Sequence, residues 1–260
     1  MKISKKDLNE LQYAKELLEN PGFLVVLSNY IGKPIELGLN SLPEQIRKQI
    51  QAKIRELLLA ALSGSIYTLS KNGSVWQSRW IHKTGAGVLG AAGGTFGIKG
   101  ALAELPISTT LLLRAIASIA REQGESLDEI ESQLACLEVF ALGSPLIETD
   151  DASESGYYAV RIALARAISE ASKHIAARGL GEEGAPLIIK LVTKIASRFS
   201  VVVSEKLAAK AVPVIGAAGG ATVNLVFMNH FQNMSEGHFI VRKLERKYGE
   251  EAVKDAYLSI

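Results

Sequence analysis

Charged side chains are rare in the most apolar part of the chain, where Lys99, Glu104 and Arg114 interrupt it. Charges in apolar surroundings pair with one another or face a cavity. With Asn224 and His238 from later in the chain, these residues are candidates for a polar cluster that binds a ligand. A structural salt bridge explains the same charges without any ligand. The sequence therefore predicts a polar cluster and leaves both roles open.

No motif for covalent, metal or nucleotide chemistry is complete in the sequence. Cys136 stands among apolar residues, as a buried structural thiol does. His230 and His238 lack the i, i+4 spacing of a helical metal site, and Gly237 is expected to interrupt a helix there. The stretch 85–91 fits a dinucleotide-binding pattern, but the residues before it do not form a strand pattern. We therefore expect no cofactor and no transition metal.

Two tryptophans have the spacing of a membrane-surface anchor. Trp76 and Trp80 lie one helical turn apart, beside Arg79 and Lys83, and precede an apolar run. Indole rings favour the membrane–water interface, and nearby cations attract anionic headgroups. Docking of both rings on the protein core is the alternative. The pattern favours a protein that binds the membrane surface peripherally.

Two Gly-rich apolar segments, residues 88–94 and 214–220, are expected at the centre of the molecule. Small residues four apart lie on one helix face and allow another helix to approach closely. The glycines expected in such contacts are Gly90, Gly93, Gly94, Gly97, Gly216, Gly219 and Gly220. The uncharged run 211–228 just reaches the length of a membrane span, but Pro213 and its glycines disfavour insertion.

The helical period of nearly all apolar segments predicts an all-α, compact multi-helix domain, with its two Gly-rich segments helical and central. Capping-box patterns are expected to start helices at Ser4 and Ser126, and prolines to start them at Pro43 and Pro106. The predicted helices cover 4–19, 43–62, 106–120, 126–143, 157–178 and 186–210, followed by two short C-terminal helices separated at Gly249. We expect an N-terminal helix (1–20) and one domain (21–260), whose halves, about 21–147 and 155–260, are pseudo-related.

Composition narrows the class of partner. The 29 basic and 27 acidic residues give a net charge of +2, too small for a nucleic-acid-binding surface. A mean hydropathy of +0.17 indicates excess apolar surface for a core, a partner or a membrane face. The N-terminus lacks an apolar signal-peptide core, and the single cysteine suits a reducing compartment. A cytoplasmic location is expected.

Several short motifs occur in a fixed order: 29–36, 104–107, 155–158 with Arg161, 213–220 with Asn224, and 237–239 with Arg242, Leu244 and Tyr248. In these motifs the chain resembles the EcsC protein family over about residues 20–260. The family more often carries Asp where this chain has Glu104. Its founding member is encoded beside an ABC transporter, so the resemblance implies an association with membrane transport and no particular reaction.

Together these features favour a non-enzymatic, membrane-peripheral protein that binds a lipid-like ligand or a membrane protein partner. The alternative is a hydrolase-type enzyme with a polar site at Glu104, Arg114 and Asn224.

Overall fold

The computed structural model describes residues 3–19, 23, 25–27, 43–62, 97–144, 156–179, 186–210 and 216–260. The regular elements in these ranges are helices: α1 (Lys5–Leu18), α4 (Glu44–Ala60), α7 (Gly97–Glu122), α8 (Ile130–Leu142), α9 (Gly156–Arg178), α10 (Pro186–Lys210), α11 (Gly216–Tyr248) and α12 (Glu250–Ser259). The all-α prediction is therefore confirmed. The helices predicted at 157–178 and 186–210 correspond closely to α9 and α10.

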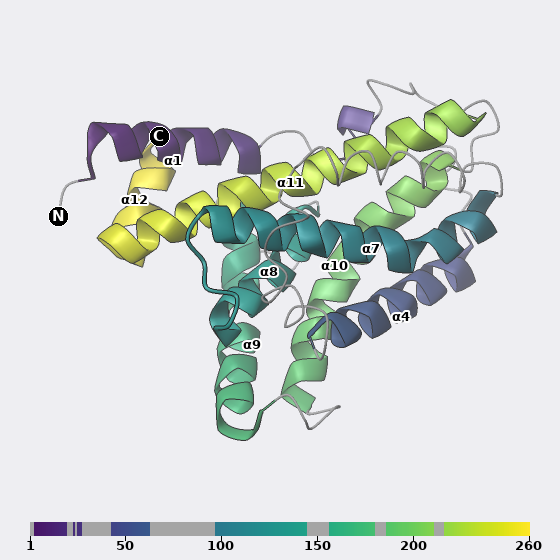
Figure 1. Ribbon diagram of the computed structural model, residues 1–260, viewed down its shortest axis with the longest axis horizontal. Helices are drawn as coiled ribbons and strands as arrows, with labels where there is room; N and C mark the ends of the chain where they lie inside the picture. The colour runs from purple at the N-terminus through teal and green to yellow at the C-terminus, as the bar shows by residue number, and fades with distance from the viewer. Residues whose placement is uncertain are drawn as a thin grey trace.

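The long helix α11 is the element against which most of the others pack (Figure 1). Helix α7 runs along it, α1 covers its C-terminal half, and α12 folds back beside α1. Helix α10 contacts α4, α7, α8, α9 and α11, while α9 packs on α8 and α10. The two chain ends lie at the same end of the molecule (Figure 1).

Helix α1 begins as the capping box predicts. The Ser4 hydroxyl accepts a hydrogen bond from the Asp7 backbone N–H at 3.2 Å, which satisfies one of the free donors of the first turn. The Asp7 carboxylate also accepts from Lys247 at 2.7 Å and from the Tyr248 hydroxyl at 2.6 Å. These bonds connect the start of α1 to the end of α11.

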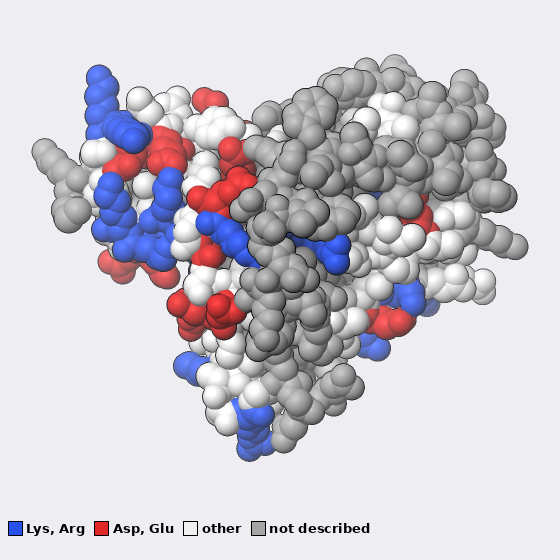
Figure 2. Space-filling view, in the orientation of Figure 1, with Lys and Arg blue, Asp and Glu red and all other residues white. Residues whose placement is uncertain are grey.

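Acidic and basic side chains interleave over the end of the molecule formed by α1, α11 and α12 (Figure 2). The pairs there include Lys247 with Asp7 and Lys243 with Glu10. In both pairs the lysine reaches solvent, and such ion pairs contribute about 0–1 kcal/mol each. We therefore infer that they help to set the relative orientation of α1 and α11 and add little stability.

The prediction that a helix starts at Pro106 is wrong, because α7 begins at Gly97 and continues through this proline. Pro106 has no N–H for the carbonyl of Leu102, and an interior proline costs about 3 kcal/mol. Fully burying one large apolar side chain contributes about 1.5–3 kcal/mol. The five buried ones of α7 are enough to offset the proline: Leu105, Leu112, Leu113, Ile116 and Ile119.

The C-terminal region is one long helix followed by a short one, and not the two short helices that the sequence suggested. Helix α11 continues through Gly237, where a break was expected. A β-carbon at Gly237 would lie 2.7 Å from Leu18 Cγ and 2.9 Å from the Ala14 carbonyl oxygen. The glycine is therefore needed for the close approach of α1, and this packing offsets its cost of about 1 kcal/mol in a helix.

The second Gly-rich segment enters the described structure at Gly216, where α11 begins, so Gly216, Gly219 and Gly220 lie in its first turns. The first segment, with Gly90, Gly93 and Gly94, lies outside the described residues, and Gly97 is the first residue of α7. That the two segments pack on each other stays a prediction.

The capping box predicted at Ser126 and Glu129 does not form. Helix α8 starts one turn later, with Glu129 as its N-cap residue and no side-chain cap. The Ser126 carbonyl instead accepts from the Glu129 N–H in a turn. The first turn of α8 is held by Ser132, whose hydroxyl donates to the buried Glu125 carboxylate at 2.7 Å. A long-range network thus replaces the local cap.

A cluster of aromatic rings forms the core where α8, α10 and α11 meet. The centroids of Phe140 and Phe199 are 4.7 Å apart, and Phe231 lies 5.3 Å from Phe199 and 5.1 Å from Phe227. All four rings are buried. Edge-to-face contacts of this kind contribute about 0.5–1.5 kcal/mol each beyond the buried area. They fix the distances between α8, α10 and α11, three of the helices that carry the polar residues described next.

Candidate functional site

Glu104 lies at the centre of a buried cluster formed by three helices. From α10, Lys206 donates to Glu104 Oε1 at 3.1 Å and Lys210 to Oε2. From α11, Asn224 Nδ2 donates to Oε1 at 2.8 Å. All four residues are at most 7 % exposed. The Lys206 ammonium also lies 4.5 Å from the centroid of the Phe227 ring, a favourable cation–π distance.

The charges in this cluster are unequal. Burial raises the pKa of the Glu104 carboxyl, but the charges of Lys206 and Lys210 outweigh it and hold the pKa below its usual value. Burial lowers the pKa of Lys206 to about 8, because Glu104 compensates only part of that effect. The two lysines thus stabilise the ionised form of Glu104, while burial weakens the charged forms of both lysines. The carboxylate is the group on which both lysines depend.

The sequence analysis identified only part of this cluster. Glu104 and Asn224 are brought together, whereas Arg114 lies ten residues further along α7, roughly 15 Å away along the helix axis. Lys99 belongs to the first turn of α7, and its side chain is outside the described residues. The sequence analysis missed the partners Lys206 and Lys210. They have an i, i+4 spacing in the mainly apolar C-terminal part of α10, and this was a usable signal.

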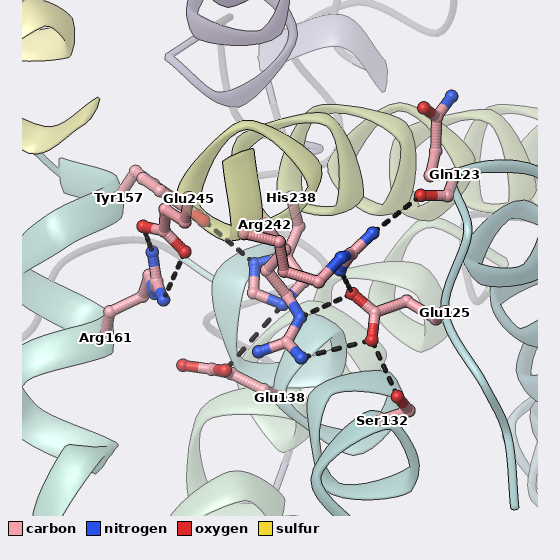
Figure 3. A network of polar contacts seen from close by, with 10 residues as sticks. Gln123, Glu125, Ser132, Glu138, Tyr157, Arg161, His238, Arg242 and Glu245 are labelled. Atoms are coloured by element: carbon pink, nitrogen blue, oxygen red, sulfur yellow. Dashed lines mark hydrogen bonds and ion pairs between the residues drawn. The ribbon is translucent and has the colours of Figure 1, made fainter. Parts of the chain in front are cut away.

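His238 belongs to a second network, between α8, α9 and α11 (Figure 3). The Tyr157 hydroxyl lies 2.9 Å from His238 Nδ1, and Nε2 lies 3.8 Å from Glu138 Oε2. His238 is fully buried, Tyr157 is 3 % exposed and Glu138 is 4 % exposed. His238 is therefore a buried core residue, and the sequence analysis did not identify the tyrosine and the glutamate beside it.

Two bidentate ion pairs flank this network on opposite sides (Figure 3). Arg161 donates to both oxygens of Glu245, at 2.5 and 3.1 Å. Arg242 donates to both oxygens of Glu125, at 2.9 and 3.1 Å, and Arg246 binds the same carboxylate. Paired guanidinium groups of this geometry are held rigidly.

The Glu138 carboxyl and the His238 ring are both shifted toward their neutral forms. Burial raises the pKa of Glu138, and the nearby Arg161 and Arg242 only partly oppose it. Burial, followed by the charges of the same two arginines, holds the pKa of His238 well below its usual value. The ring is therefore neutral at physiological pH, with one nitrogen as donor and the other as acceptor.

An open groove of about 670 Å³ lies beside the second network. Helix α9 contributes aliphatic side chains, including Ile162, which is 47 % exposed, and also the charged Arg161 and Lys173. Helices α8, α11 and α12 contribute charged residues. The groove is lined by Glu131, Glu138, Tyr158, Arg161, Ile162, Ala165, Ile168, Ser169, Ser172, Lys173, Arg242, Glu245, Glu250, Glu251 and Lys254. Its volume is in the range typical of small-molecule sites.

The predicted membrane-surface residues, Trp76, Arg79, Trp80 and Lys83, lie outside the described residues. Within the described ranges, no three His, Cys, Asp or Glu side chains are placed to hold a metal ion. One stretch of α7, Leu102–Glu122, has the length and composition of a membrane span, but most of it is buried in the fold, as in core helices of soluble proteins. The run 211–228 begins outside the described residues.

The described helices, their buried polar networks and the groove define an all-α protein with two distinct internal charge clusters. The chain belongs to the EcsC protein family, whose model matches residues 5–244. No curated protein and no solved structure matches the chain significantly. Any function is therefore inferred from the chain's own residues.

Proposed function

We propose that this protein is a non-enzymatic binding protein that holds a lipid-like, amphiphilic molecule in the groove between α8, α9, α11 and α12. The observation that carries the proposal is the mixed lining of this groove. Ile162, Ala165 and Ile168 form an aliphatic side, and charged residues of α8, α9, α11 and α12 line the rest. An alkyl chain against the first side would be stabilised by roughly 0.8 kcal/mol per buried CH₂.

The Glu104 cluster supports an internal, stabilising role rather than the hydrolase alternative. Its carboxylate accepts hydrogen bonds from two lysines and an amide, and these four residues are almost fully excluded from solvent. Catalytic groups must reach a substrate, whereas a buried ion cluster with its carboxylate fully engaged holds helices together. We therefore place the ligand in the open groove.

The groove proposal predicts that a bulky side chain at Ala165 blocks binding. Ala165 is an exposed residue of α9 on the aliphatic side. An Ala165→Trp substitution should weaken the binding of octyl amphiphiles, measured by isothermal titration calorimetry below their micelle concentrations, at least about tenfold by filling the space of the chain. The matched control is Ala177→Trp, an exposed position on the same helix away from the groove. The proposal fails if no octyl amphiphile binds, or if both variants bind like the wild type.

The protein is further proposed to act at the cytoplasmic membrane surface, where such ligands are found. The support is the sequence pattern of Trp76 and Trp80 beside Arg79 and Lys83. The family's link to an ABC transporter suggests a membrane protein as an alternative binding partner.

A Trp76→Ala, Trp80→Ala double variant should lose co-sedimentation with anionic liposomes, because indole rings supply the interfacial anchoring. Binding of the wild type should weaken with added salt, since each nearby cation contributes about 1 kcal/mol. Tyr13→Ala, at an exposed aromatic residue of α1, is the control. Wild-type protein that stays in the supernatant with liposomes of every composition would rule out the peripheral location.

A further inference from the structure

One carboxyl group on the groove wall has an unused hydrogen-bonding capacity. Glu138 lines the groove, is 4 % exposed, and makes no hydrogen bond to any residue that the structure describes. A buried carboxyl group normally has a hydrogen-bond partner, because leaving it without one costs the free energy of desolvation. A ligand in the groove can supply the hydrogen-bond partner that the Glu138 carboxyl lacks.

His238 determines how this carboxyl group is oriented. Its Nδ1 is engaged by the Tyr157 hydroxyl at 2.9 Å, so its Nε2 is the nitrogen that faces Glu138 Oε2, at 3.8 Å. The ring and the tyrosine are buried and cannot turn into the groove. One carboxyl oxygen of Glu138 therefore faces His238, and the other is available to a ligand. In Figure 3 the carboxyl group extends from α8 into the space between Arg161 and Arg242.

The surrounding charges favour an uncharged ligand group. Around Glu138, three guanidinium groups stand against three carboxylates when Glu138 is ionised, so the charges sum to zero. The guanidinium groups are those of Arg161, Arg242 and Arg246, and the other carboxylates are those of Glu125 and Glu245. At the rim, Lys173 and Lys254 face Glu131, Glu250 and Glu251. A charged head group would add a charge that no group beside Glu138 balances.

We propose that Glu138 binds a hydroxyl group of a neutral, polyol-type head group on the amphiphile held in this groove. This inference rests on the proposed function, since it names the polar end of the same ligand. A hydroxyl group both donates and accepts, so it can bind Glu138 whether the carboxyl is ionised or protonated. An ammonium group cannot accept a hydrogen bond, and a sulfate group cannot donate one.

The test compares three amphiphiles that share an octyl chain: octyl β-glucoside, octyltrimethylammonium and octyl sulfate. Binding to the full-length protein is measured by isothermal titration calorimetry below the micelle concentrations. The wild type should bind the glucoside at least about tenfold more tightly than either charged amphiphile, the size expected for a hydrogen bond to a charged group. Equal affinities for the three would overturn the assignment.

Two substitutions at Glu138 separate the hydrogen bond from the charge. Glu138→Leu should reduce glucoside affinity about tenfold, with Glu131→Leu at the exposed rim as the matched control. Glu138→Gln keeps a donor and an acceptor in either protonation state of the native carboxyl, so it should retain glucoside binding within about threefold. The second variant alone tests the proposal if the leucine variant does not fold. A glucoside preference that survives Glu138→Leu, or glucoside binding that Glu138→Gln abolishes, would overturn it.

The two proposals fail in different ways. If amphiphiles bind and Ala165→Trp weakens them, but their head groups make no difference, the groove holds the chain and Glu138 is not the head-group residue. If no amphiphile binds, the proposed function itself is wrong.

Discussion

Replacing Glu104 with alanine is expected to lower the free energy of unfolding by about 3–5 kcal/mol, the cost of leaving buried charges without their partner. The variant removes the one carboxylate that Lys206 and Lys210 share. Both lysine side chains then stay buried beside each other without the carboxylate that stabilises their charged forms. Urea unfolding followed by circular dichroism measures the loss.

Three comparisons make this result specific. Glu56→Ala removes the exposed partner of Lys53 on α4 and should cost less than about 1 kcal/mol. Lys206→Met should cost less than Glu104→Ala, because Glu104 and Lys210 remain as a balanced pair. Combining Glu104→Leu with methionine at Lys206 and Lys210 should recover much of the stability, as apolar replacements of whole buried ion clusters do. A Glu104→Ala variant as stable as the Glu56→Ala control would show that solvent reaches the cluster.

A Gly237→Leu substitution is expected to destabilise the protein by about 3 kcal/mol or more, at the upper end of the range for overpacking. The first added carbon would already meet the side chain of Leu18 at 2.7 Å and the carbonyl oxygen of Ala14 at 2.9 Å. A side chain can change rotamer, but the carbonyl can move only with the whole of α1. Helix α1 should therefore separate from α11.

The displacement of α1 can be measured separately from stability. Limited proteolysis with trypsin should cleave the Gly237→Leu variant at Lys5, Lys6 or Lys15 faster than the wild type, because a detached terminal helix unfolds locally. Asn229→Leu introduces a leucine at an exposed position of α11, so it controls for the effect of a leucine that makes no close contact with α1. Unchanged trypsin cleavage in Gly237→Leu would mean that α1 does not depend on this contact.

The sequence by itself determined the class of fold and much of the local structure. The bounds of α9 and α10 and the Ser4 cap of α1 follow from apolar periodicity and from side chains that satisfy nearby backbone groups. These are interactions between residues a few positions apart, so a linear pattern contains them. The same local rules misplaced the start of α7 at Pro106 and a break at Gly237. At both positions the burial of side chains against other helices outweighs the local cost.

The tertiary structure alone decided which polar residues meet. The sequence marked Glu104, Asn224 and His238 as unusual, but it grouped His238 with the wrong cluster and did not pair Glu104 with Lys206 and Lys210. Glu104 and these lysines are 102 and 106 positions apart, and Tyr157 and His238 are 81 apart. Such pairs form only where α7 packs on α10 and α11 and where α9 packs on α8 and α10. Helical periodicity tells which face of a helix is polar. Which neighbouring helix packs against that face depends on packing across the whole fold.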